Sequence, residues 1–117
     1  MAKPKTHIPH LPTKYDPVRD RRVPYVDVWV AEEKFGKIAL MSDSILNPSK
    51  NRDQFDQALE QVADAAANVK AEDWIMAVGD VLLVAAAIAY AIDQNGSARV
   101  LRWDKEKRSY YEVEMTL

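Results

Sequence analysis

The stretch that decides the fold runs from residue 73 to residue 103 and reads DWIMAVGDVLLVAAAIAYAIDQNGSARVLRW. Its pattern predicts a strand over 73–78, a helix from 81 to about 93 and a second strand that ends at Trp103. The connections between these elements are short. A strand, a helix and a strand joined in this way predict a βαβ unit, in which the strands run parallel and the crossover is right-handed.

Both ends of the predicted helix have stop signals. Asp80 suits the N-cap, because its carboxylate can accept hydrogen bonds from the first free backbone N–H groups. Gly96 suits the left-handed residue that closes a helix. A membrane span is the alternative, since such a span needs about 20 apolar residues and extension upstream to Trp74 approaches that length. Gly79 and Asp80 interrupt the longer run, which favours a buried helix in a soluble domain.

The predicted helix is apolar on every side. No residue from 81 to 92 is charged, and Tyr90 has the only polar side-chain atom. Such a helix is expected to be covered all round. One sheet covers one side only, so we expect the opposite side to pack on another helix or on the same helix of a second subunit. Alanines would let that neighbour approach closely, and a homo-oligomer, with a dimer favoured, is expected. The predicted interface residues on this helix are Ala85, Ala86, Ala89 and Tyr90.

Length and composition limit the class of protein. With 117 residues the chain has the size of one domain. It has no cysteine, which excludes disulfides, thiolate chemistry and cysteine-ligated metals. The amino-terminal residues include lysine, histidine and proline instead of the apolar segment of a signal peptide. We therefore expect a soluble cytoplasmic protein that does not enter a membrane.

The net charge of −2 hides an uneven distribution. Residues 1–24 have six basic and two acidic side chains, residues 25–96 have five and twelve, and residues 97–117 have five and four. Five of the six prolines lie in 1–24, so this segment is expected to be an extended basic arm beside a single domain over 25–117. Such an arm suits nucleic acid or an acidic protein surface, and the second is favoured. The arm's predicted interface residues are Arg19, Arg21 and Arg22.

Two strands and a helix are predicted between the arm and residue 73. Alternating valines predict a half-buried strand over 25–31, and 37–41 reads as its hairpin partner. A helix capped by Ser49 or Asn51 is expected to run to about Val69, because apolar residues repeat at spacings of three and four. Its other side has an acidic row, either a solvated face or a docking surface for a basic segment such as the arm. The acidic row consists of Asp56, Glu60 and Asp64.

The last elements complete the predicted order. A charged turn over 104–107 leads into alternating residues over 109–115, which predicts a carboxy-terminal hairpin with 99–103. The element order is then ββαβαββ. The predicted fold class is α/β or α+β, with two helices on a mixed sheet.

The residues that could perform chemistry are few. His7 and His10 are the chain's two histidines. A metal site needs further ligands at fixed positions, and the proline between these histidines prevents a helical arrangement, so neither a metal nor a cofactor is predicted. No Ser/His/Asp arrangement can be defended, since both histidines lie in the arm. A non-enzymatic protein is expected.

Two alternative binding functions stay open. The turn at Gly79-Asp80 lies between a strand and a helix, where nucleotide phosphates commonly bind. It has one glycine, and Asp80 would repel an anion, so a structural turn is favoured over a nucleotide or metabolite site. The last hairpin combines aromatic rings with cations, which is the chemistry of single-stranded nucleic-acid binding, although acidic neighbours favour a solvated rim. The candidate nucleic-acid residues are Arg99, Arg102, Trp103, Lys105, Arg108 and Tyr110.

Four short segments resemble a known group of proteins. They are Asp73-Trp74, Val78-Gly79-Asp80, Leu101-Arg102-Trp103-Asp104 and Tyr110-Tyr111-Glu112-Val113. Over residues 73–115 the chain resembles small accessory proteins of tailed bacteriophages. The resemblance implies a phage accessory protein made in the host bacterial cytoplasm, and it implies no activity and no site. With the predicted interface, it leads to the hypothesis of a self-associating protein that acts by binding a second copy or a host protein.

Overall fold

The computed structural model describes residues 3–24, 28–43 and 52–117. Its strands are β1 (Lys5–Ile8), β2 (Thr13–Asp16), β3 (Arg21–Pro24), β4 (Lys37–Leu40), β5 (Trp74–Met76), β6 (Ala98–Asp104) and β7 (Ser109–Met115). Its helices are the 3-10 helix η1 (Trp29–Ala31) and the α-helices α1 (Glu32–Phe35), α2 (Arg52–Ala66) and α3 (Val81–Asn95).

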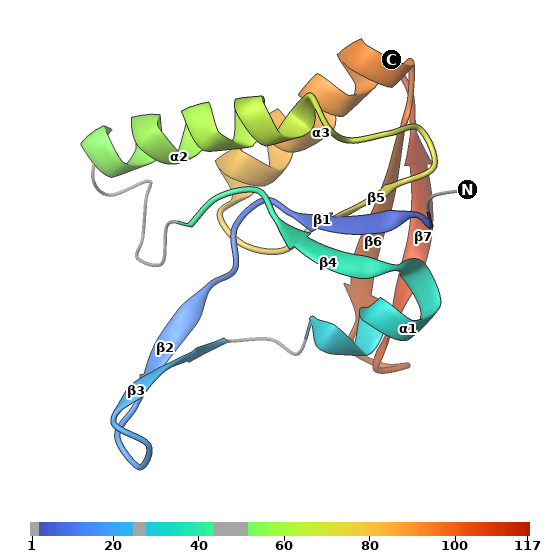
Figure 1. The fold of residues 1–117 in the computed structure, drawn as a ribbon. Coiled ribbons are helices and arrows are strands. Elements are labelled where there is room, and N and C mark those ends of the chain that lie inside the picture. The colour runs from blue at the N-terminus through green and yellow to red at the C-terminus, as the bar shows by residue number, and fades with distance from the viewer. Residues whose placement is uncertain (1–2, 25–27, 44–51) are drawn as a thin grey trace.

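The main sheet is mixed and has helices on both faces (Figure 1). Its five strands have the order β4-β1-β5-β6-β7, in which the first four are parallel and β7 is antiparallel to β6. β2 and β3 pair only with each other, as a separate two-stranded sheet. The chain winds outward from β1 in both directions, as in doubly wound folds. The predicted mixed α/β class is therefore confirmed.

Two clusters of buried side chains make up the core, one on each face of the sheet. α2 and α3 cover the face to which Ile75 and Val100 belong. η1 and α1 cover the other face, to which Trp74, Met76 and Leu101 belong. Successive residues of a strand point to opposite faces, so this assignment also places every neighbouring residue of β5, β6 and β7.

The predicted βαβ unit is confirmed. β5 precedes α3 in the chain and β6 follows it. The two strands are adjacent and parallel in the sheet, with Ile75 beside Val100. The Asp80 carboxylate accepts from Leu82 N and Leu83 N, as expected of an N-cap. Gly96 has a φ of 83°, and its N–H donates to the Ile92 carbonyl at 2.7 Å. Within the described residues, no helix is long and apolar enough to cross a membrane.

The amino-terminal segment differs from the predicted arm. β1 lies inside the sheet, with β4 on one side and β5 on the other, so residues 5–8 belong to the domain. Thr6, His7 and Ile8 are buried. The physical reason is the spacing of the prolines: Pro4 and Pro9 leave four consecutive residues between them that have backbone N–H groups, enough for a short strand. Only the later part of the segment, the β2–β3 hairpin, extends away from the body (Figure 1).

The strand predicted over 25–31 is also corrected. Residues 25–27 lie outside the described residues, and the chain from Trp29 to Phe35 is helical. Val28, Ala31 and Phe35 are buried at spacings of three and four, whereas Val30 is exposed. That helical spacing competes with the local valine alternation, and packing on the sheet decides in its favour. The predicted hairpin with 37–41 is therefore wrong, since β4 pairs with β1 in parallel.

The helix predicted before residue 73 is confirmed as α2. Ala58, Val62 and Ala66 are buried on its apolar side. Its proposed caps, Ser49 and Asn51, lie outside the described residues. The helix ends at Ala66, earlier than the predicted Val69, and turns follow.

Candidate functional site

The most distinctive surface of the protein is the uncovered side of α3. Leu83, Ala87 and Ala91 face the core and are buried. Val81 is 75% exposed and Leu82 is 54% exposed, although both side chains are aliphatic. Within residues 3–24, 28–43 and 52–117, α3 is thus covered on one side only, and these residues do not provide the complete enclosure expected of so apolar a helix.

The predicted interface residues of α3 divide between these two sides. Ala85 and Ala89 are exposed one helical turn apart, and Tyr90 is 41% exposed. Ala86 is half-buried and packs at the margin of the core. Three of the four residues are therefore accessible, while Ala86 is largely occupied by the chain's own core.

α2 cannot cover the open side, because it is already packed on another part of α3. At the end of α3, Gln94 Nε2 donates to the carbonyls of Ala67 at 3.1 Å and Val69 at 2.9 Å. Asn95 Nδ2 donates to the Val69 carbonyl at 3.0 Å. These side chains anchor the segment that follows α2 to the end of α3.

β7 extends the exposed apolar area. Val113 lies beside Val100, so it belongs to the sheet face that α2 and α3 cover. Tyr111 and Met115 share that face by alternation, and all three side chains are 37–43% exposed. α3 packs over β5 and β6, and β7 is the next strand of the sheet. We call these residues together the α3–β7 surface: Val81, Leu82, Ala85, Ala89, Tyr90, Tyr111, Val113 and Met115.

The sequence interpretation missed the β7 part of this surface. The alternation that was used to predict the strand already placed Tyr111, Val113 and Met115 on one face. The alternation does not predict the order of the strands, in which β7 is at the edge of the sheet. A neighbouring strand or helix would otherwise have buried these side chains.

The acidic row and the predicted arm residues lie at separate places. Asp56, Glu60 and Asp64 are exposed along α2, and Arg52 Nε contacts Asp56 Oδ1 at 3.1 Å. Arg19, Arg21 and Arg22 belong to the β2–β3 hairpin or its turn, which is far from α2 in the same molecule (Figure 1).

The two histidines have structural surroundings. His7 Nε2 donates to Asp73 Oδ2 at 2.9 Å, and both residues are buried. The same carboxylate accepts from the backbone N–H groups of Lys5 and Lys70, each at 3.0 Å. Burial raises the pKa of Asp73, but the hydrogen bonds from His7, Lys5 and Lys70 outweigh it, and the pKa lies below its ordinary value.

The Gly79-Asp80 turn is filled by the protein itself. A Cβ at Gly79 would lie 2.0 Å from the His10 carbonyl oxygen, which shows how closely the two backbones approach. The Asp80 N–H donates to His10 Nδ1 at 3.0 Å, and the Asp80 carboxylate caps α3. The groups that could recognise a nucleotide at this turn are therefore engaged in internal contacts. No group of three or more potential metal ligands is found among the described residues.

The candidate nucleic-acid residues do not form one surface. Arg99 and Trp103 lie on the sheet face of η1 and α1, and Tyr110, beside Trp103, is buried there. Arg102 lies on the opposite face, beside Tyr111. Lys105 and Arg108 belong to the turn between β6 and β7. A strand of nucleic acid could not contact all of these side chains at once.

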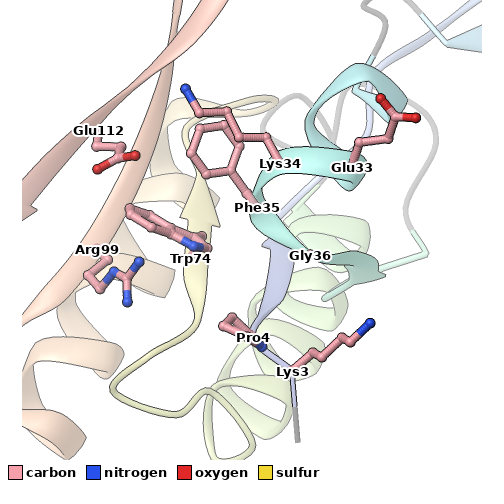
Figure 2. A pocket seen from close by; sticks show the side chains of 9 residues that line it. All are labelled: Lys3, Pro4, Glu33, Lys34, Phe35, Gly36, Trp74, Arg99 and Glu112. Atoms are coloured by element: carbon pink, nitrogen blue, oxygen red, sulfur yellow. The ribbon is translucent and has the colours of Figure 1, made fainter.

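A pocket of about 330 Å³ opens on the face of η1 and α1, near the amino ends of the parallel strands (Figure 2). Arg99 stacks on the Trp74 ring, with 3.5 Å from the guanidinium carbon to the ring centroid. Phe35 meets the same ring at an angle of 68°, 5.3 Å between centroids. The indole is thus covered by its own neighbours and is only 7% exposed, so it offers no open face for stacking a ligand. Glu112 and Lys34 also line the pocket (Figure 2).

The comparisons with known proteins give one family. Residues 4–117 match the family model described as phage Pam3 gp32-like protein. This confirms the phage resemblance found over 73–115 and extends it to nearly the whole chain, the β2–β3 hairpin included. Neither the curated proteins nor the solved structures give a match.

Proposed function

Since the chain belongs to the family of phage Pam3 gp32-like proteins, we propose that it is a non-enzymatic phage accessory protein that associates with a second copy of itself. The contact is made by the α3–β7 surface. The protein acts in this proposal by binding, in the host cytoplasm where phage proteins are made.

The observation that carries the proposal is the exposed apolar side of α3. Isolated exposed apolar residues are common, but a contiguous apolar patch marks an interaction site. Val81, Leu82 and Tyr90 are exposed on a single helix, and β7 adds three more exposed large side chains on the sheet face that this helix covers. Removing a leucine or valine side chain from water is worth about 1.5–3 kcal/mol, so burying several of them can stabilise a complex.

The small residues on this side favour another copy of the same helix as the occupant. Ala85 and Ala89 are exposed and four residues apart, so their Cβ atoms lie on one face of α3. Two helices that meet at alanines can approach closely, and a two-fold axis would place the same patch on both sides of the contact. An apolar helix of a host protein is the alternative occupant.

The experiment measures molar mass by sedimentation velocity from one to one hundred micromolar, on the wild type and on Leu82→Asp. Leu82 is exposed in the monomer, so the substitution is expected to leave the fold unchanged and to place a charge inside the contact. The wild type should approach twice the monomer mass, and L82D should remain monomeric. Circular dichroism checks that both have the same helix content.

Val30→Asp provides a matched control. Val30 is 53% exposed, almost the same as Leu82, but it lies on η1 on the other side of the sheet. V30D should therefore associate like the wild type. A wild type that stays monomeric over the whole concentration range would exclude self-association, and equal loss in both variants would exclude the α3–β7 surface as its site.

A further inference from the structure

We propose that the β2–β3 hairpin is a second interaction surface, and that it docks on the exposed acidic side of α2 in a neighbouring copy of the same chain. This contact is different from the α3–β7 contact. It joins two unlike surfaces, the hairpin of one molecule and α2 of the next.

The hairpin is held together by hydrogen bonds between its own residues and not by packing on the core. Neither β2 nor β3 has a buried residue. Arg22 reaches across from β3 and donates to Thr13, from Nε to Oγ1 at 2.9 Å and from Nη2 to the carbonyl at 2.7 Å. In the turn, Asp16 Oδ1 accepts from Val18 N at 3.0 Å, and the Tyr15 hydroxyl donates to Asp20.

A hairpin of this kind needs a surface to pack on. An isolated two-stranded hairpin is marginally stable in water, and stability usually comes from a third strand or from packing against a helix. Tyr15 is 53% exposed and Val18, at the tip, is 92% exposed. The hairpin is thus shaped in advance, projects from the body (Figure 1), and has side chains that this molecule leaves in water.

Charge identifies the surface that fits. Residues 13–24 have four basic and two acidic side chains, a net charge of +2. Residues 52–66, which form α2, have one basic and four acidic side chains, a net charge of −3. The acidic residues Asp53, Asp56, Glu60 and Asp64 are all exposed. Arg21 and Lys14 share one face of the hairpin with Asp16 by the strand register, and Arg19 Nε in the turn lies 3.7 Å from Asp16 Oδ2.

The complementary surfaces cannot meet within one molecule. The hairpin points away from the body at the lower left of Figure 1, whereas α2 lies at the top, so the proposed partner of the hairpin is α2 of another copy. A nucleic acid would also attract the hairpin, but residues 25–96, with five basic and twelve acidic side chains, would repel it.

The contact has a consequence for assembly. A contact between two unlike surfaces leaves a free hairpin at one end and a free α2 at the other, so it continues until it closes into a ring or extends into a filament. Together with a two-fold contact through the α3–β7 surface, it would give assemblies larger than a dimer.

A charge exchange tests the proposal with the full chain. The hairpin variant is Arg19→Glu with Arg21→Glu, and the helix variant is Glu60→Lys with Asp64→Lys. Sedimentation velocity at low salt should show that each variant associates at least about tenfold more weakly than the wild type through this contact, because attraction becomes repulsion. The variant with all four substitutions, and an equimolar mixture of the two double variants, should recover the association. Raised salt should weaken the wild-type contact.

A matched control reverses the same number of charges elsewhere, in Lys105→Glu with Lys107→Glu, and should have no effect. L82D separates this contact from the proposed two-fold one: loss of mass in L82D but not in the hairpin variant supports the α3–β7 surface and rejects the hairpin contact. The reverse result supports the hairpin contact and rejects the α3–β7 surface. The hairpin contact is also rejected if the double variants associate more weakly and the fourfold variant does not recover the association. It is rejected as well if a labelled oligonucleotide binds the wild type and not the hairpin variant while the molar masses of the two proteins are equal.

Discussion

The imidazole of His7 and the carboxylate of Asp73 form a buried hydrogen bond that joins β1 to the segment entering β5. His7 Nε2 lies 2.9 Å from Asp73 Oδ2, and the two residues are separated by 66 positions in the chain. The Asp73 carboxylate also accepts from Lys5 N and Lys70 N. A single side chain thus connects β1, the turn after α2 and β5, and this explains how a short strand near the amino terminus is held inside the sheet.

Replacing Asp73 by Asn should lower the free energy of unfolding by about 2 kcal/mol, because the amide cannot accept at both positions from all three donors. The measurement is chemical denaturation at pH 7. Glu72→Gln is the control, since Glu72 is exposed and its side chain is the neighbouring carboxylate. Equal stability of D73N and the wild type would contradict the role assigned to this carboxylate.

The same carboxylate should make the fold sensitive to acid. Its pKa in the folded protein is below the ordinary value of 3.8, so its contribution to stability is complete above that value. The contribution is lost as the pH falls through 3.8 towards the lower pKa of the folded state. Thermal unfolding between pH 6 and pH 2.5 should show a smaller decrease for D73N than for the wild type. Parallel curves for the two proteins would contradict this linkage.

Gly79 and Gly96 should respond very differently to alanine. Both have positive φ angles, 102° and 83°, so alanine is strained at either position. At Gly96 nothing lies within 4 Å of an added Cβ, and the expected loss is about 1 kcal/mol. At Gly79 the added Cβ would lie 2.0 Å from the His10 carbonyl oxygen, so the turn has to move, and a loss above about 3 kcal/mol is expected. Denaturation of the two variants side by side measures the difference, and similar losses would show that His10 does not pack closely on this turn.

The parts of the fold that were predictable from sequence depend on local chemistry. Asp80 and Gly96 bound α3 because a cap is decided by a few neighbouring residues. β1 was missed because its four residues have weak local signals, and their place in the sheet depends on β4 and β5, which are more than 25 residues away. Val28 shows a related limit, since alternation describes 25–31 and helical spacing describes 28–35, and packing on the sheet decides for the residues that the two patterns share.

The candidate surface was predictable in the same partial way. The apolar composition of α3 predicts that another element covers the helix. In the structure the side with Leu82 and Ala89 is exposed. Tyr111, Val113 and Met115 could not be assigned, because exposure of a strand face depends on the order of the strands. The acidic row of α2 was predicted from the four-residue spacing and is exposed as expected.

Arg22 should control the order of the β2–β3 hairpin without affecting the core. Its guanidinium makes two bonds to Thr13 across the hairpin, while Arg22 itself is exposed. Arg22→Gln cannot reproduce both bonds, so the hairpin should open more often, and trypsin should cleave after Arg19 and Arg21 several times faster than in the wild type. Global unfolding should change by less than about 0.5 kcal/mol, because no core residue is touched. Lys14→Gln removes a cation from the same hairpin and keeps Arg22, the donor of both bonds to Thr13, so its cleavage rate should stay near that of the wild type. Equal cleavage rates in R22Q and K14Q would mean that the Thr13 contacts do not hold the hairpin, and its preformed shape would then need another cause.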